Sequence, residues 1–251
     1  MAARVAQLWR HPIKGLGSEA MSEAQLSAGQ TMPWDRVWAV AHEASRLNGD
    51  ADGWVPCSNF CRGAKAPSLM AVRARIDETG GRILLSHPER PDIEVNPDDP
   101  ADAERLIDWV APLVPENRAQ PSRIVRAKRG MTDSDFPSIA VLNLSSLLAL
   151  SQRLGCDLQM ERFRGNIWLE GLPVWGEFDL VGHDIEIGTV VLRIRERITR
   201  CRATSVDTTT GKIDVDTLAA LEAGWGHQDF GIYAEVVRGG RIATGDEVRV
   251  Q

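Results

Sequence analysis

The chain has 251 residues, 43% of them hydrophobic, which is enough to bury one large core or two smaller ones. Lys and Arg (29) nearly balance Asp and Glu (35), and the formal net charge of -6 excludes the polybasic field that drives nucleic-acid binding. No apolar run approaches the roughly 18 residues of a membrane span, and the first residues lack the apolar core of a secretory signal. We therefore expect a cytoplasmic protein without a membrane span and, from four irregularly spaced cysteines, free thiols.

The first half of the chain is predicted to be mostly sheet. Short alternating or β-branched segments, punctuated by Gly, Pro and Asn, indicate strands at residues 5–9, 37–41, 70–76, 82–86 and 93–96. Apolar residues at three- and four-residue spacing then predict a helix over residues 101–113, which prolines close. Residues 115–121, which begin and end with proline, are the expected boundary between two domains.

The second half is predicted to continue as strands with two helices. Asn143 follows strand-like residues 139–142 and is a candidate N-cap, so a helix should run from there to a stop at Gly155. A short helix is expected at 217–223, and further strands at 123–127, 166–169, 184–187, 190–195, 232–237 and 247–250. These patterns predict a mixed, β-rich α+β fold of two domains, residues 1–120 and 121–251, with a few short helices.

Cys201 is the cysteine with the most unusual surroundings in the sequence. Four arginines lie within six residues of it, namely Arg195, Arg197, Arg200 and Arg202. Cations beside a thiol favour the thiolate, which attacks electrophiles or binds soft metals. The alternative is a buried structural cysteine at the end of a strand whose arginines face solvent, and the local sequence leaves both open.

The sequence lacks the motifs of several common enzyme classes. The five histidines are dispersed and form no HExxH pair, there is no Walker loop, and no serine lies in a GxSxG elbow. Gly15-Leu16-Gly17 lacks the third glycine of a dinucleotide fingerprint. Cys57 and Cys61 have no second pair of ligands at the spacing of a structural zinc site.

Basic residues next to predicted strands suggest a pocket for a phosphorylated ligand. Lys14 directly follows a strand-like segment, Arg36 precedes another, and Arg164 and Asn166 stand at the start of a third. Each of them alone is more often a solvated surface group. Together with the backbone amides at the start of the helix that Asn143 caps, they can hold an anion.

Ordered motifs run along almost the whole chain. In the first half they are His11-Pro12-Ile13-Lys14 and Asp35-Arg36-Val37-Trp38. In the second half they are Arg164-Gly165-Asn166-Ile167, Gly182, Ile187-Gly188, Thr199-Arg200-Cys201, Val206-Asp207, Thr210-Gly211, Phe230-Gly231-Ile232-Tyr233-Ala234-Glu235-Val236 and Gly245-Asp246-Glu247-Val248. This order resembles MOSC proteins of the amidoxime-reducing branch, in which a β-barrel domain precedes a MOSC β-barrel domain.

The resemblance implies a molybdenum cofactor bound as Mo-molybdopterin, and pyridoxal phosphate is not expected. The residues that it places at the cofactor are Lys14, Gly15, Arg36, Asn143, Ser145, Arg164, Asn166 and Cys201, with Cys201 as the metal ligand. The implied catalytic residues are Cys201, Arg200 and Asp207, the last two orienting substrate or relaying protons. The donor chemistry agrees, because the pterin phosphate needs basic groups and dithiolene-bound molybdenum accepts a further soft thiolate.

The activity implied by the resemblance is reduction of N-hydroxylated or N-oxide substrates, with electrons from a separate flavin, haem or iron–sulfur protein. An alternative is a sulfur-carrier or cofactor-handling module in which Cys201 carries a persulfide, since a low thiol pKa also aids sulfur transfer. A third is a binding protein without activity. A departure from the family pattern motivates it, because the segment at Phe178 and Leu180 has lost an aspartate and a tryptophan. No proline follows Asp207 either, and both departures are expected to reshape the substrate mouth.

Overall fold

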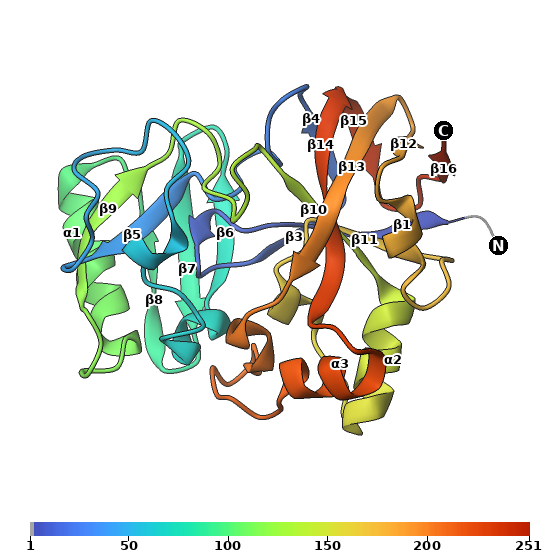
Figure 1. Cartoon of the computed structure of the whole chain (residues 1–251). Helices are drawn as coiled ribbons and strands as arrows, with labels where there is room; N and C mark the ends of the chain where they lie inside the picture. The colour runs from blue at the N-terminus through green and yellow to red at the C-terminus, as the bar shows by residue number, and fades with distance from the viewer. Residues whose placement is uncertain (1–2) are drawn as a thin grey trace.

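Two strand-rich lobes make up residues 3–251, which are the residues that the computed structural model describes (Figure 1). Three α-helices accompany sixteen strands within these residues. In Figure 1 the lobe on the left carries α1 and β5 to β9, and the lobe on the right carries α2 and α3. The predicted β-rich α+β class is confirmed.

The left-hand lobe, called the N-lobe below, contains two three-stranded sheets. The first has the order β2 (Ile13–Lys14), β5 (Trp38–His42) and β9 (Pro121–Arg126). The second is an antiparallel meander of β6 (Arg73–Asp77), β7 (Arg82–His87) and β8 (Arg90–Val95). Its helical segments are α1 (Pro100–Val110) and the 3-10 helices η1 (Cys57–Asn59), η2 (Pro67–Ala71) and η3 (Ala111–Leu113).

The C-lobe is built on an eight-stranded sheet. Its strand order is β16 (Val248–Val250), β12 (Asp184–Ile187), β13 (Val190–Thr199), β14 (Asp229–Arg238), β10 (Ile139–Asn143), β11 (Ile167–Glu170), β1 (Arg4–Arg10) and β3 (Glu19–Met21). A separate pair joins β4 (Glu23–Leu26) to β15 (Gly240–Ala243). The helical segments are α2 (Leu144–Leu154), α3 (Thr217–Trp225), η4 (Met160–Phe163), η5 (Gly176–Leu180) and η6 (Arg202–Ser205).

Strands on each side of the expected domain boundary belong to the other lobe. The N-terminal strands β1, β3 and β4 belong to the C-lobe, where β1 pairs with β11 and β4 with β15. Conversely, β9 follows the expected boundary at 120/121 yet pairs with β5 in the N-lobe. The division at 120/121 stays a prediction, and the chain crosses between the lobes on both sides of it.

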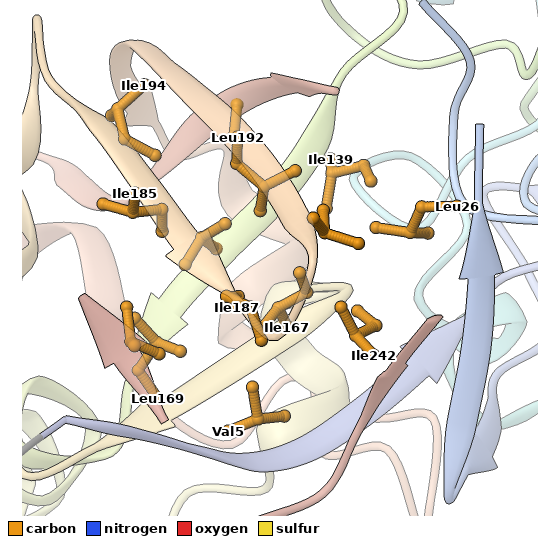
Figure 2. Packing of buried hydrophobic residues seen from close by; sticks show 14 of the residues in the cluster. Val5, Leu26, Ile139, Ile167, Leu169, Ile185, Ile187, Leu192, Ile194 and Ile242 are labelled. Atoms are coloured by element: carbon orange, nitrogen blue, oxygen red, sulfur yellow. The ribbon is translucent and has the colours of Figure 1, made fainter. Parts of the chain in front are cut away.

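Each lobe has its own hydrophobic core. In the C-lobe, Val5 and Leu26 from the N-terminal strands pack with Ile139 and Ile167, as Figure 2 shows. In the N-lobe, Trp38 is fully buried among the aliphatic side chains of both sheets and of α1. A buried side chain of this kind contributes roughly 1.5–3 kcal/mol relative to an exposed one. Each lobe is therefore stabilised by a hydrophobic core of its own.

The structure departs from the predicted elements in two respects. The strand expected over residues 70–76 begins only at Arg73, because residues 67–71 form the 3-10 helix η2, which Pro67 starts. The strands β2, β3, β4 and β15 were not expected, since each has only two to four residues, too few to show a period of two.

The predicted N-cap and stop of α2 are confirmed. The Asn143 side-chain oxygen accepts a hydrogen bond from the Ser145 amide (3.0 Å), and Gly155 ends the helix in the left-handed conformation (φ 69°). The Asn143 amide nitrogen also donates to Oε2 of the buried Glu177 (2.8 Å), as does Ser146 Oγ (2.9 Å). Glu177 Oε1 has no partner among residues 3–251, and burial raises the pKa of this carboxyl group.

Glu177 is expected to make the chain less stable as the pH rises. Because its pKa is higher in the folded state than in the unfolded chain, its favourable contribution is complete below the ordinary glutamate pKa and is lost as the pH passes through the raised value. Glu177→Gln keeps a hydrogen-bond acceptor and removes this titration. Urea unfolding at a series of pH values should show a smaller fall in the free energy of unfolding for Glu177→Gln than for wild type. The exposed Glu170→Gln is the control, and parallel pH profiles for all three proteins would contradict the assignment.

Candidate functional site

A cavity of about 300 Å³ lies between the two lobes. The N-lobe side of its wall includes Lys14, Gly15, Arg36, Trp54, Cys57, Arg62 and Met70. The C-lobe side includes Ala140, Arg162, Phe163, Arg164, Ile198, Arg200, Cys201, Ala203 and Tyr233. Asp133, from the segment between β9 and β10, also lines it. Ligand pockets in proteins enclose roughly 300–1,000 Å³, so this cavity is large enough for a small ligand.

Unusual backbone geometry accompanies three of the basic side chains. Lys14 ends β2, and at the left-handed Gly15 (φ 82°) a Cβ would lie only 2.6 Å from the Cys61 carbonyl oxygen. Arg36 (φ 53°) precedes β5 and Arg164 (φ 48°) lies between η4 and β11, both in the left-handed region that favours glycine. Such conformations cost about 1–3 kcal/mol each and concentrate at functional sites.

Arg36 and Arg164 meet where the lobes meet. Arg36 is buried, forms an ion pair with Asp35, and donates from Nη2 to the Arg164 carbonyl oxygen (3.0 Å). The partly buried Arg164 guanidinium donates to the carbonyl oxygens of Ile13 and Gly17 (both 3.1 Å). Burial, followed by the charge of Arg36, lowers the pKa of Arg164 to about 9. Arg164 is thus a charged group whose hydrogen-bond partners within residues 3–251 are neutral carbonyls.

Lys14 and Arg200 add two more positive charges to the wall. Lys14 is buried and forms an ion pair with the exposed Asp133 (2.6 Å), while burial lowers the pKa of Lys14 against the opposing effect of Asp133. Arg200 donates from Nε to the Phe230 carbonyl oxygen (2.7 Å) and from Nη1 to that of Phe163 (2.8 Å). Burial lowers the pKa of Arg200 to about 10, so it remains charged at neutral pH.

The charge balance of the cavity wall fits an anionic ligand. Among the described residues, Asp133 is the one carboxylate in this wall, and it is engaged by Lys14. The wall holds six Lys and Arg side chains, of which Arg162 is paired outside it with Asp214 (2.6 Å). Cations out of water are unfavourable unless they are compensated, and a phosphate group would compensate them.

Cys201 lines the same cavity and is exposed. It follows β13, one residue after Arg200, and stands at the start of η6. Arg195 pairs with Glu235 of β14, Arg197 lies over the Phe178 ring of η5, and Arg202 lines a separate surface depression. Of the four arginines that lie near Cys201 in the sequence, Arg200 is therefore the one that also lines the cavity. The exposure of Cys201 also contradicts the alternative of a buried structural cysteine.

A metal in this cavity would need ligands beyond those of the protein. Within residues 3–251 no group of three or more His, Cys, Asp or Glu residues is arranged to hold a metal ion. The wall holds two thiols, the exposed Cys201 and the half-buried Cys57, whose Sγ accepts a hydrogen bond from Arg62 Nη1 (2.6 Å). The exposed thiol beside several cations fits a metal that arrives with its own anionic ligand, as a molybdenum bound to a phosphorylated dithiolene does. The chemistry of the donor set is thus compatible with the cofactor that the sequence resemblance implies.

Comparison with known families agrees with the two-lobed architecture. The sequence model of the MOSC N-terminal beta barrel domain matches residues 2–111, and that of the MOSC domain matches residues 131–249. The chain belongs to the MOSC domain family. The family resemblance expected from the ordered motifs is confirmed.

Relatives of this MOSC protein are distant. It is 25% identical to mitochondrial amidoxime-reducing component 1 of Mus musculus over 97% of this chain and 81% of that protein. Identity to the Homo sapiens protein of the same name is 24%, over 82% and 67% of the two chains. Among solved structures, the YUAD protein from Bacillus subtilis gives a TM-score of 0.47 at 13% identity, covering 100% of this chain and 96% of that one. YiiM from Geobacillus stearothermophilus gives 0.36 at 19% identity, covering 45% and 53%.

The structure brings together six of the site residues expected from the sequence, namely Lys14, Gly15, Arg36, Arg164, Arg200 and Cys201. Asn143, Ser145 and Asn166 do not line the cavity, because C-lobe backbone groups occupy their side chains. Ser145 Oγ donates to the Leu172 carbonyl oxygen (2.7 Å), and Asn166 Oδ1 accepts from the Ala140 amide (3.0 Å). Asp207 is also outside the lining, where its carboxylate accepts from two backbone amides of its own turn.

Several residues of the cavity wall were not expected from the sequence. Tyr233 belongs to a quoted motif but had no assigned role, and burial raises its pKa to about 12, which keeps its hydroxyl protonated. Asp133, Trp54, Cys57 and Arg62 carried no functional signal, because they lie in segments without a regular hydrophobic period. As a further check on the sequence, no helix among residues 3–251 is long and apolar enough to span a bilayer.

Inorganic phosphate is expected to raise the melting temperature of the cofactor-free MOSC protein. An anion that binds the folded cavity stabilises it by mass action, by about 2.7 kcal/mol at 100 times its Kd. Arg164→Gln should remove most of the phosphate-dependent rise in a thermal melt at constant ionic strength. The control is Arg193→Gln, whose exposed guanidinium pairs with Asp184 on the sheet surface. An undiminished phosphate effect in Arg164→Gln would show that the anion binds elsewhere.

Proposed function

We propose that this MOSC protein binds a molybdenum cofactor between its lobes and reduces N-hydroxylated or N-oxide substrates with electrons from a separate protein. The observation that carries the proposal is the presence, in one cavity wall, of an exposed thiol and of several cations, of which Arg164 and Arg200 have carbonyl oxygens rather than carboxylates as partners among the described residues. The family membership and the distant similarity to amidoxime-reducing components support it. The molybdenum cofactor would supply two-electron oxygen-atom chemistry.

The chain's own residues divide the task of holding the cofactor. Lys14, Arg36 and Arg164 line the cavity and would bind the pterin phosphate through charge-assisted hydrogen bonds. Gly15 leaves the backbone close to Cys61 and free of a side chain. Cys201, through its Sγ, would be the protein ligand to the metal.

We assign two side chains of the cavity wall to the substrate. Arg200 stays charged beside Cys201 and is fixed by the carbonyl oxygens of Phe163 and Phe230, so it can orient a substrate oxygen. The Tyr233 hydroxyl is protonated across the working pH range and can donate a hydrogen bond to that oxygen. Asp207 lies outside the lining, which leaves Arg200 as the better placed of the two residues first proposed for substrate.

Metal and pterin analysis of wild type beside Cys201→Ser tests the proposal. Expressed in a host that makes the cofactor, wild type should copurify with molybdenum and pterin and reduce benzamidoxime with an artificial electron donor. Cys201→Ser should retain pterin, because the cations remain, and lose activity by more than about 100-fold, the upper range for outer-shell changes. Cys156→Ser, a half-buried cysteine outside the cavity wall, should match wild type.

Two outcomes would contradict the proposal. Wild type without molybdenum or pterin from such a host would exclude cofactor binding, and unchanged activity in Cys201→Ser would exclude its ligand role. The sulfur-carrier alternative predicts a different product. Mass spectrometry would then find a persulfide on Cys201 in protein that holds no pterin.

A further inference from the structure

A loop between β5 and η1 forms part of the cavity wall. Residues 43–56 have no regular helix or paired strand beyond one bridge, in which the Ala51 amide donates to the Arg126 carbonyl oxygen (3.1 Å). The Lys128 amide donates back to the Ala51 carbonyl oxygen (3.2 Å), and Lys128 Nζ pairs with Asp52 (2.6 Å). The loop is therefore fastened to the N-lobe just before the residues that reach the cavity.

Of two neighbouring residues at the end of the loop, Trp54 lines the cavity and Val55 packs into the N-lobe. Val55 packs against the buried cluster that contains Phe60 and Val125. Trp54 lines the cavity and keeps 42% of its surface exposed. Of the six exposed large hydrophobic residues within 3–251, Trp54 is the one in the cavity wall. An exposed tryptophan fastened beside a ligand cavity offers a flat apolar face to whatever enters.

The neighbouring wall on both lobes is apolar. Met70 comes from η2, Ile198 from the end of β13 and Ala203 from η6, two residues after Cys201. The lobes touch here, because a Cβ placed on Gly63 would lie 2.4 Å from Met70 Sδ and 3.5 Å from the Ala203 Cβ. The cavity wall therefore offers apolar side chains from both lobes in addition to its cations.

We propose that Trp54 is a specificity-determining residue whose ring stacks on a planar, aromatic N-hydroxylated substrate with its N–O group directed towards Cys201. This proposal rests on the proposed function, and it names the substrate class of the same site. Stacking on an aromatic ring rewards flat, apolar substrates over compact aliphatic ones. The loop residues 43–56 thus select the substrate without contacting the cations that bind the cofactor.

The test compares an aromatic with an aliphatic substrate in variants of Trp54. Aromatic pairs contribute enough that Trp54→Ala should raise the KM for benzamidoxime roughly 3- to 10-fold. The KM for acetamidoxime and the molybdenum content should stay at wild-type values. Trp54→Phe should restore most of the benzamidoxime KM, and Leu148→Ala, an exposed apolar residue outside the cavity, should leave both substrates unchanged.

A binding measurement separates this proposal from the proposed function. Saturation-transfer NMR on the purified chain should show contact with benzamidoxime that Trp54→Ala weakens and Trp54→Phe retains, whether or not turnover is detected. Equal weakening for benzamidoxime and acetamidoxime, or no difference between wild type and Trp54→Ala, would overturn the role of Trp54. If Trp54→Ala fails to fold, the same comparison is made with Trp54→Leu, which keeps an apolar side chain without a ring. If wild type from a host that makes the cofactor holds no molybdenum but still shows binding that depends on Trp54, only the proposed function is refuted.

Discussion

The contact between Arg36 and Arg164 places two like charges side by side at the junction of the lobes. Arg36 Nη2 donates to the Arg164 carbonyl oxygen, and the Arg164 guanidinium donates to the carbonyl oxygens of Ile13 in β2 and of Gly17. Both residues hold a left-handed backbone that costs free energy, and like charges removed from water repel each other. A chain that keeps these unfavourable features has a cavity prepared for an anion.

The rest of the structure follows from keeping that junction in place. Strands β1 and β3 belong to the C-lobe sheet and β9 belongs to the N-lobe, so the chain crosses between the two walls of the cavity more than once rather than through a single linker. Cys201 and Arg200 enter from the end of β13, and Trp54 enters from a loop fastened to the opposite lobe. The cations, the Cys201 thiol and the Trp54 ring thus come from segments that are far apart in the sequence and meet only in the folded chain.

The sequence predicted the long elements and part of the site, for identifiable reasons. Strands and helices with a clear period, and the caps at Asn143 and Gly155, depend on local chemistry and were found. Asn143 and Asn166 were assigned to the cofactor, because local sequence cannot tell whether a side-chain amide will meet a ligand or a backbone group of another strand. Asp133 and Trp54 were missed, since only tertiary contacts bring their loops to the cavity.

The central claim is that one protein thiolate binds the metal of a cofactor held by the cations of both lobes. Molybdenum K-edge X-ray absorption of the loaded protein tests it most directly, because the number of sulfur neighbours around the metal is measured without reference to turnover. The account predicts one sulfur neighbour fewer in Cys201→Ser than in wild type, at equal molybdenum content. The same sulfur count in both proteins would contradict it.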